Sequence, residues 1–409
     1  MKPLGRRVRF PYALKPSLVM VAMGLVALVA LSGWGRHSHA CSIAKVECLG
    51  IGELLAQREG YGRAATGGLG GRVVLVTSSA DSGPGTLRNL VERAREPLWV
   101  IFASDLSIDL KSQIGVSSNI TIDGRGRSVT LHDWGLSLVN VDNVIVTHVA
   151  VDGRFREGAQ AINLAPAHDV WLDHLTLART QDRLINVKAG STDVTLSWIR
   201  FEDHNKVMLF NNLVSENLFE FYERDSRLRV SLHHSYFFDT IQRNPRAQIG
   251  TSHIYNNLLE NWNFYGMSFS LEHRSLIEGN IFNNTANRPC TVPREIGENY
   301  CKDVGTAPAL TALTNGAADK EEYDKSNLKY HYIHDWRAFL KVNDNLYLGD
   351  SKAVLADYRP EDVPVPPYCY SYERPDKALA DRIRVGAGNH GRPMPTIERT
   401  CPVGAGATP

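Results

Sequence analysis

Three ionisable residues of this 409-residue chain recur at a nearly constant distance from the start of a repeated, strand-like segment. Asp182 and Lys206 each lie twelve residues after such a start, and Arg243 lies thirteen residues after one. If the segments are parallel strands stacked coil on coil, the three side chains share one strip of surface, roughly 5 Å apart per step. Gln160 and Asn186, each sixteen residues after a start, would flank this strip from a neighbouring column.

A surface strip that carries an ammonium and a guanidinium group suits an anionic sugar chain. Arg can bind a carboxylate through two parallel N–H groups, whereas Lys supplies a compact point charge. A solvated ladder of opposite charges on a repeat protein would give the same spacing, and such exposed pairs stabilise little. The spacing alone therefore leaves a binding strip and a charge ladder as equal alternatives.

The strip exists only if the repeated segments fold alike, and their sequences indicate strands. The segments begin at Ile120, Val144, Val170, Val194, Val230, His253 and Leu276. Their starts are separated by 24, 26, 24, 36, 23 and 23 residues, and apolar residues alternate within each segment. Asn, Asp or Gly then interrupts the alternation, whereas a helical repeat would show an apolar stripe about every 3.6 residues. The pattern predicts an all-β chain built as a parallel β-solenoid with one coil per segment.

A column of flat side chains is expected at the corner of each coil. The residues four positions into the segments are Gly124, His148, His174, Trp198, His234, Asn257 and Asn280. Amide and imidazole groups stacked inside a turn can hydrogen-bond to their neighbours instead of remaining unpaired. We therefore interpret His148, His174 and His234 as structural residues, although each would be a candidate catalytic group in isolation.

Both ends of the chain differ from the repeats. The first forty residues hold six basic residues and no acidic one, and Leu18 to Gly33 is almost wholly apolar, which is typical of a secretory signal. We expect cleavage after Ala40 and a secreted or periplasmic protein; an uncleaved anchor or a lipid-modified Cys41 is the alternative. An exposed loop is expected between Phe210 and Arg229, where one coil is longer. The predicted division is a signal peptide at 1–40, an N-terminal segment at 41–59, a β-helix at 60–347 and a loop-rich C-terminal tail at 348–409 packed on the solenoid.

All six cysteines lie outside residues 49–289, and an even number in an exported chain suggests disulfides. Fifteen connectivities are open. Short separations favour Cys41 with Cys48, Cys290 with Cys301, and Cys369 with Cys401. Without the signal the chain has 39 basic and 44 acidic residues, which does not resemble the basic surface of a nucleic-acid-binding protein. We expect a monomer that binds no nucleic acid and, after signal cleavage, no membrane.

Seven stretches follow one another in an order typical of a single enzyme family. They are residues 59–62, 66–71, 81–88, 118–126, 169–174, 203–209 and 242–246. The last three read Asp-Val-Trp-Leu-Asp-His, Asp-His-Asn-Lys-Val-Met-Leu and Gln-Arg-Asn-Pro-Arg. Together they resemble polysaccharide lyase family 1, the pectate and pectin lyases. The resemblance covers residues 59 to about 283, and it implies a right-handed parallel β-helix that acts on a uronic-acid polysaccharide, α-1,4-linked galacturonan.

The resemblance also implies roles for four residues. Arg243 would take the C5 proton of a uronate residue, and Lys206 would hold the carboxylate of that residue. Arg246 and Gln248 would bind the substrate. The reaction would be a β-elimination across C4 and C5, which breaks the glycosidic bond without water. Cations near the carboxylate would stabilise the enolate-like transition state, and burial beside other cations would help Arg243 to lose its proton.

The candidate metal site departs from the family. Pectate lyases resemble one another in three aspartates that bind calcium, and this chain has Gln160, Asp182 and Asn186 at those positions. Calcium affinity falls as ligand charge is removed, so we expect calcium to bind weakly, to be bridged by the carboxylates of the substrate, or not to bind. Tight binding would require carboxylates from elsewhere, such as Asp152 or Glu157.

Three other functions compete with that of a pectate lyase. Gln248 resembles the pectin lyases, which act on methyl-esterified polymer without calcium. A polygalacturonase-type hydrolase is disfavoured, because hydrolysis needs two carboxylates and the strip offers only Asp182. A non-catalytic polysaccharide-binding or surface protein that kept the scaffold stays open, although a binder needs cations but not the spacing of Lys206, Arg243 and Arg246.

Overall fold

The computed structural model describes residues 49–211, 218–285, 309–311, 334–351, 356–391 and 399–402. The chain divides into two units, residues 1–53 and 54–409, and the repeats belong to the second unit. The predicted signal and the predicted pairs Cys41–Cys48 and Cys290–Cys301 lie outside the described residues. Within the described ranges, no helix is both long and apolar enough to cross a membrane.

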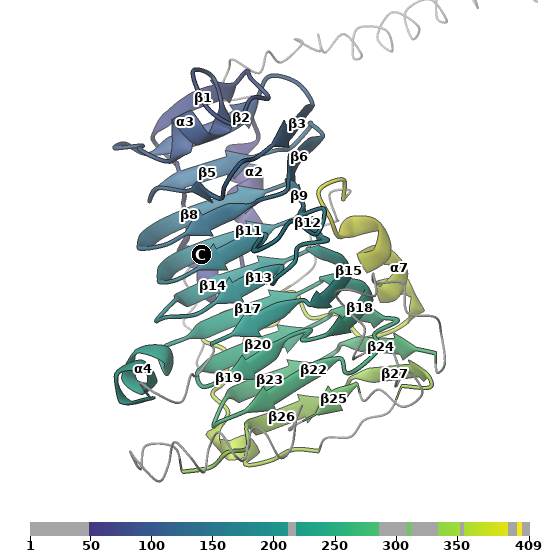
Figure 1. Cartoon of the computed structure of the whole chain (residues 1–409). Helices are drawn as coiled ribbons and strands as arrows, with labels where there is room; N and C mark the ends of the chain where they lie inside the picture. The colour runs from purple at the N-terminus through teal and green to yellow at the C-terminus, as the bar shows by residue number, and fades with distance from the viewer. Residues whose placement is uncertain are drawn as a thin grey trace, which may run out of the picture. The chain divides into compact units, whose positions relative to one another are not determined.

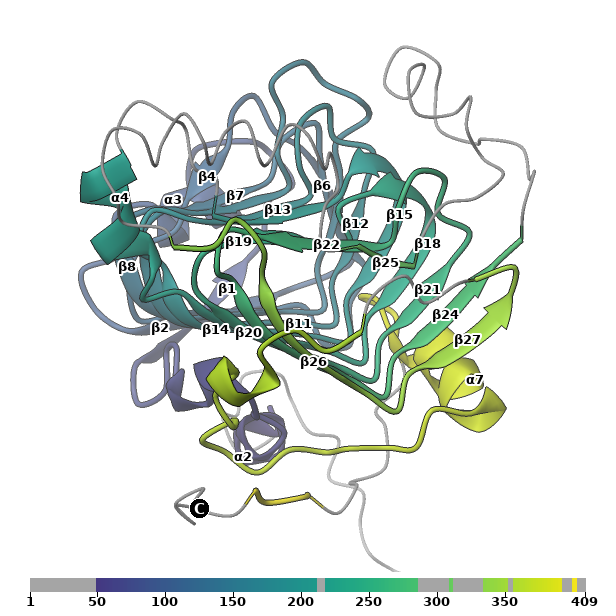
Figure 2. The same ribbon diagram turned by 90° about the horizontal axis from the view of Figure 1, so that it is seen from below.

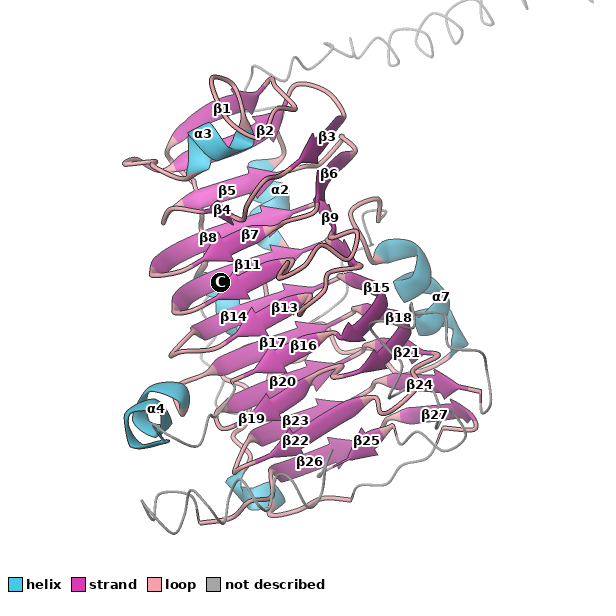
Figure 3. Cartoon of the chain, in the orientation of Figure 1, coloured by secondary structure: helices cyan, strands magenta, loops and turns pink. Residues whose placement is uncertain are grey.

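Three parallel sheets build the second unit (Figure 1; Figure 3). Sheet A contains β1 (Arg72–Val76), β2 (Leu98–Phe102), β5 (Ile120–Asp123), β8 (Val141–Thr147), β11 (Ala167–Asp173), β14 (Thr192–Ser197), β17 (Arg229–His233), β20 (Thr251–Tyr255), β23 (Arg274–Glu278) and β26 (Phe339–Asn343). Sheet B contains β3 (Leu106–Asp109), β6 (Val129–His132), β9 (Ala150–Asp152), β12 (Thr176–Ala178), β15 (Arg200–Lys206), β18 (Tyr236–Gln242), β21 (Leu258–Glu260), β24 (Ile281–Asn284) and β27 (Leu346–Gly349). Sheet C contains β4 (Ile114–Gly115), β7 (Leu136–Leu138), β10 (Ile162–Leu164), β13 (Ile185–Val187), β16 (Met208–Phe210), β19 (Arg246–Gln248), β22 (Met267–Ser270) and β25 (Leu310–Thr311). The predicted parallel β-helix is confirmed.

Short helices lie outside the sheets. They are α2 (Ile51–Ala56), η2 (Tyr61–Ala64), α3 (Leu87–Val91), α4 (Leu218–Asp225), η3 (Pro360–Asp362) and α7 (Lys377–Gly386). Helix α4 occupies part of the long connection predicted between Phe210 and Arg229, of which residues 212–217 lie outside the description.

The repeat predicted from the sequence sets the register of sheet A over its first five segments. Ile120 pairs with Val144, Val144 with Val170, Val170 with Val194, and Val194 with Val230. These residues and the apolar residues two positions after them are fully buried and belong to one continuous interior cluster. Figure 2, which looks along the stack, shows the three sheets around that interior. Because side chains alternate between the faces of a strand, each coil fills its own slice of the core.

The predicted register is wrong by one residue in the last two segments. Val230 pairs with Ser252 rather than His253, and Ser252 pairs with Ser275 rather than Leu276. A slip of one residue moves a side chain to the other face of a strand. His253 therefore lies on the outer face of sheet A, where its ring stacks on that of Tyr255 at 4.4 Å.

A stack of four rings forms at the corner between sheets A and B, which confirms the structural interpretation of the histidines. Ring centroids are 4.6 Å apart between His148 and His174, 5.8 Å between His174 and Trp198, and 4.7 Å between Trp198 and His234. The predicted position of this stack inside the turn is wrong, because Trp198 packs against a separate apolar cluster that includes residues of α7. The stack thus lies between the coils and the C-terminal segment.

The two asparagines predicted for this column belong to the next column instead. The Asn257 Nδ2 donates to Asn280 Oδ1 at 2.9 Å, and the Asn280 Nδ2 donates to Asn345 Oδ1 at 2.9 Å. All three amides also donate to backbone carbonyls of the coil before them. This second ladder satisfies backbone groups that the turn would otherwise leave unpaired.

The glycine-rich stretch that opens the unit lies against the outer face of sheet A. The Tyr61 N–H donates to Ser231 Oγ and the Gly62 N–H donates to Thr195 Oγ1, each at 2.9 Å. A Cβ on Gly62 would lie 2.4 Å from the carbonyl oxygen of Val170, so no larger residue fits there without movement. Glycine is required because the backbone itself contacts the sheet.

The C-terminal tail contains a helix where only loops were predicted. Helix α7 begins at the N-cap Asp376, whose side chain accepts a hydrogen bond from the Leu379 N–H at 2.8 Å. Its buried residues Leu379, Ala380 and Ile383 pack on sheet B, and Figure 1 shows α7 beside that sheet. The predicted disulfide between Cys369 and Cys401 is confirmed.

Several buried histidines should make the fold sensitive to acid. Burial lowers the pKa of His148, His204 and His273 to about 4, so the native protein holds them neutral. In the unfolded chain these histidines bind protons below about pH 6.5. Their contribution to the free energy of unfolding is therefore fully present above that pH and is lost as the pH drops toward 4. Each histidine contributes up to about 1.4 kcal/mol per pH unit in this window. Urea unfolding at several pH values between about pH 7 and pH 4.5 would measure how steeply the free energy of unfolding falls with pH. The variant His273→Gln should show a shallower fall. A free energy of unfolding that does not change with pH would contradict the expectation.

Replacing His174 should reduce stability before it affects function. His174→Ala removes two ring contacts and the 2.6 Å hydrogen bond to the buried carboxylate of Asp173, which should lower the free energy of unfolding by about 1–3 kcal/mol. The elimination activity expected from the resemblance should persist well below the melting temperature. His168→Ala is the control, because that side chain is 46% exposed. A folded, stable but inactive His174→Ala protein would reverse the structural interpretation.

Candidate active site

The predicted cations meet where sheet B passes into sheet C. Lys206 ends β15 and pairs with Gln242, the last residue of β18, so Arg243 immediately follows the partner of Lys206. The Met208 N–H donates to the carbonyl oxygen of Arg243 at 2.8 Å, which fixes the two turns side by side. The Gln242 Nε2 also donates to Asn205 Oδ1 at 3.0 Å. The spacing in the sequence therefore placed Lys206 and Arg243 in neighbouring coils correctly.

Arg243 is held in an environment that disfavours its charge. Its backbone has a left-handed φ of 64°, and its Nε is buried without a hydrogen-bond partner among the described residues. Burial lowers the pKa of Arg243, and the positive charges of Arg183 and Arg246 lower it further, whereas Tyr265 raises it. A guanidinium in these surroundings releases a proton more readily than one in water.

Arg246 and Gln248 both lie on β19. Arg246 pairs with Leu209 and with Ser268 in the neighbouring strands of sheet C, and its side chain is partly exposed. Gln248 is 1% exposed. The structure therefore brings Arg246 near Arg243, while the burial of Gln248 does not favour a direct contact with a polymer.

The three candidate metal ligands meet in one hydrogen-bonded group. The Gln160 Nε2 donates to Asp182 Oδ2 at 2.7 Å, and the Asn186 Nδ2 donates to Gln160 Oε1 at 2.9 Å. The shared column predicted for Gln160 and Asn186 is wrong, because Asn186 pairs with Asn163. The turn before β10 is three residues longer than the turn before β13, which shifts the register.

This group does not fit a calcium ion. The Arg183 Nη1 lies 3.1 Å from both carboxylate oxygens of Asp182, so the single negative charge already has a cationic partner. Gln160 directs an N–H group at Asp182, and its amide oxygen already accepts a hydrogen bond from Asn186. Calcium requires several oxygen ligands and gains affinity from carboxylate charge. One neutralised carboxylate supplies neither.

His204 fixes the turn that carries Asp182. The fully buried imidazole donates from Nε2 to the carbonyl oxygen of Asp182 at 2.6 Å. Burial lowers the pKa of His204 to about 4, so the ring is neutral at ordinary pH. The neutral ring links the coil of Lys206, to which His204 belongs, to the coil of Asp182 through this hydrogen bond.

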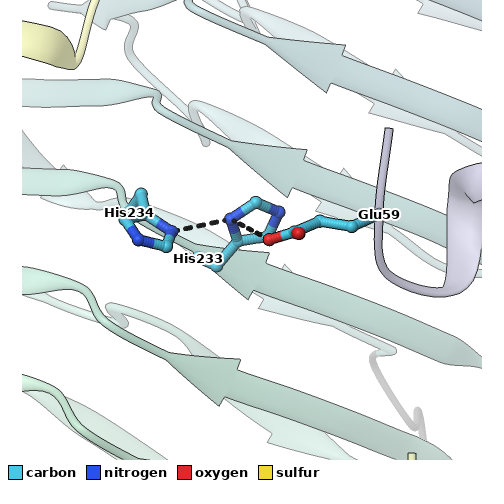
Figure 4. Close-up of side chains that lie close together, drawn as sticks. All are labelled: Glu59, His233 and His234. Carbon is cyan, nitrogen blue, oxygen red and sulfur yellow. Dashed lines mark hydrogen bonds and ion pairs between the residues drawn. The ribbon is translucent and has the colours of Figure 1, made fainter. Parts of the chain in front are cut away.

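A second group of titratable residues lies on the outer face of sheet A (Figure 4). The Nδ1 atoms of His233 and His234 are 2.9 Å apart, and His233 Nδ1 lies 3.5 Å from Glu59 Oε1. The Glu59 carboxylate also accepts hydrogen bonds from Tyr255 Oη at 2.7 Å and from the Ser371 N–H at 3.0 Å. With its oxygens already bonded, Glu59 joins the N-terminal segment, sheet A and the tail, and we interpret the group as structural.

His148, Asp173 and His174 also lie close enough together to be considered as metal ligands. The two rings are within 12° of parallel with centroids 4.6 Å apart. A metal ion lies in the plane of an imidazole that binds it, and these two planes do not meet between the rings. The arrangement is a stack rather than a metal centre.

Two residues near the strip were not predicted as site residues. Arg183 directly follows Asp182, and a cation beside an expected calcium ligand was an available signal. Tyr265 lies two coils after Lys206 in sequence and gave no local signal, because only the coil stacking brings it to Arg243.

The sequence of the chain is similar to a family model and to curated proteins. A family model described as pectate lyase matches residues 105–339. A pectate lyase of Nicotiana tabacum is 33% identical over 248 residues, which are 54% of this chain and 61% of that protein. Probable pectate lyase 4 of Arabidopsis thaliana is 37% identical over 234 residues, again 54% and 61% of the two chains. The chain thus spans about 61% of the length of these curated relatives.

Solved structures share the fold at lower identity. The cedar pollen allergen jun a 1 superposes with a TM-score of 0.63 at 24% identity, over 84% of this chain and 94% of that chain. A pectate lyase from Bacillus sp. N165 in complex with trigalacturonate gives a TM-score of 0.59 at 20% identity, over 81% and 98% of the chains. At such identities the likeness concerns the β-helix alone.

The free protein should not respond to calcium at about 0.1 mM, because the one carboxylate of the group is paired with Arg183. Ligand binding raises the melting temperature appreciably only above its dissociation constant. Thermal unfolding in a chelator and in added calcium would measure the shift, with magnesium as the control ion. A titration at micromolar affinity without substrate would contradict the expectation and would direct attention to Asp152 or Glu157.

Proposed function

The chain belongs to the pectate lyase family, as the resemblance in its sequence predicted, and we propose that it cleaves α-1,4-linked galacturonan by β-elimination. The relatives supply the reaction class, and the Bacillus enzyme that shares the fold was solved with trigalacturonate. The observation that carries the proposal is the group of cations around the partly buried Arg243. The predicted signal supports action outside the cytoplasm, and we propose that the protein acts as a monomer.

In the proposed reaction Arg243 removes the C5 proton of a uronate residue. The electron pair of the C5–H bond forms the C4–C5 double bond, the C4–O bond breaks, and the leaving oxygen takes a proton from water. Lys206 and Arg246 face the substrate carboxylate and stabilise the negative charge that grows beside C5. Burial supports the role of Arg243, because it lowers the pKa of that guanidinium.

A polysaccharide-binding protein without catalysis is the second candidate. It is favoured by the loss of two of the three expected calcium carboxylates, since only Asp182 remains. Measuring unsaturated product by ultraviolet absorbance would separate the two, with polygalacturonate and methyl-esterified pectin as substrates and with calcium or chelator present. Binding to either polymer without product would refute the lyase and support the binder.

Replacing the proposed base tests the mechanism directly. Arg243→Lys keeps the charge but not the planar guanidinium, so turnover should fall more than tenfold, which corresponds to about 1.4 kcal/mol or more in the barrier. The melting temperature should change little. Arg72→Lys is the matched control, because Arg72 lies on β1 with a side chain 66% exposed. Retention of more than about a tenth of the wild-type rate would remove Arg243 as the base.

A further inference from the structure

We propose that Arg183 occupies the place of a divalent cation in this site, so that it binds the substrate carboxylate and the elimination runs without metal. The inference rests on the proposed lyase function and names a further substrate-binding residue for it. It starts from the disagreement between the residues present and the calcium that the family implies.

The position of Arg183 is fixed by a chain of polar contacts. Its Nη1 lies 3.1 Å from both oxygens of Asp182, and Asp182 Oδ2 accepts a second hydrogen bond from Gln160 at 2.7 Å. Gln160 in turn accepts a hydrogen bond from the buried Asn186 at 2.9 Å. Of the three residues expected to hold a metal, Asp182 contacts the guanidinium of Arg183, Gln160 contacts Asp182, and Asn186 contacts Gln160. A side chain anchored in this way is ready to bind a ligand without first losing much rotational freedom.

Arg183 keeps capacity for a ligand. Its side chain is 20% exposed, so part of the guanidinium is open to a ligand. A guanidinium carries five N–H groups, and Asp182 engages only one nitrogen of it. A substrate carboxylate is an acceptor that would pair with the remaining N–H groups.

Arg183 is also electrostatically coupled to the proposed base. Its positive charge is one of the influences that lower the pKa of Arg243, as is that of Arg246. A uronate whose carboxylate lies between Arg183 and Lys206 would place C5, the carbon that loses its proton, near Arg243. A divalent ion at the same place would face these cations with only Asp182 to attract it, which disfavours metal binding.

The first experiment measures product formation by the full chain in the presence of a chelator. Wild-type protein should act on polygalacturonate in chelator, and millimolar calcium should change its rate less than about twofold. Arg183→Ala should lower kcat/KM at least tenfold in chelator, which is about 1.4 kcal/mol, and Arg183→Lys should restore part of the loss. Arg179→Ala is the matched control, because it breaks a similar pair with Asp152 outside the strip and should leave the rate unchanged.

The second experiment measures calcium binding by thermal unfolding and needs no turnover. Gln160→Asp with Asn186→Asp should gain only a small calcium-dependent rise in melting temperature while Arg183 remains. Adding Arg183→Gly should raise calcium affinity by at least tenfold over that double variant. Equal affinity with and without Arg183 would overturn the proposal. So would a wild-type enzyme that needs calcium, or an Arg183→Ala protein that is fully active in chelator, and both would leave the lyase function standing. A wild-type protein inactive on every uronan would sink the lyase function instead, and the thermal measurement would still decide whether Arg183 holds the cation position.

Discussion

Parallel hydrogen bonding between coils is the constraint on which the rest of this structure depends. Each strand pairs with the strand one coil away, so a residue meets its counterpart 20 to 65 residues later in the chain. The coils are held roughly 5 Å apart by this pairing. Side chains of neighbouring coils must therefore be compatible in size, charge and hydrogen bonding. The ring stack, the asparagine ladder and the strip of cations are three outcomes of that requirement.

Of these three outcomes, the strip of cations carries the largest electrostatic repulsion. Arg183 pairs with the carboxylate of Asp182, and Lys206, Arg243 and Arg246 lie in the neighbouring coils. Positive charges that share a partly buried surface repel one another, and the repulsion is strongest where water is excluded. The surrounding coils fix the arrangement, and under the proposed function an anionic polymer would relieve the repulsion on binding. A metal ion would add to the repulsion, in agreement with the presence of Gln160 and Asn186 where the family resemblance implies carboxylates.

The covering of sheet A shows how the two ends of the second unit stabilise the coils. Serine, threonine, histidine and tyrosine side chains line the outer face of the sheet and accept or donate hydrogen bonds to the glycine-rich opening and to the tail. Glu59 accepts hydrogen bonds from Tyr255 of sheet A and from Ser371 of the tail. These contacts keep polar groups of the sheet paired where water does not reach them. They also explain why several histidines are buried far from the proposed chemistry.

The sequence by itself determined the class of fold and the strip, because both follow from a period that is local to each coil. Alternation of apolar residues fixes which side of a strand faces the interior, and nearly equal distances from the segment start, twelve and thirteen residues, place Lys206 beside the turn of Arg243. Only the tertiary structure determined the strand register where the turns between strands differ in length. Three extra residues before β10 move Gln160 out of the column of Asn186, and one residue moves His253 to the outer face. It also decided that Arg183 takes the carboxylate of Asp182, since an adjacent pair of opposite charges can turn toward or away from each other. Only the contact with Gln160 from the preceding coil selects one of these orientations.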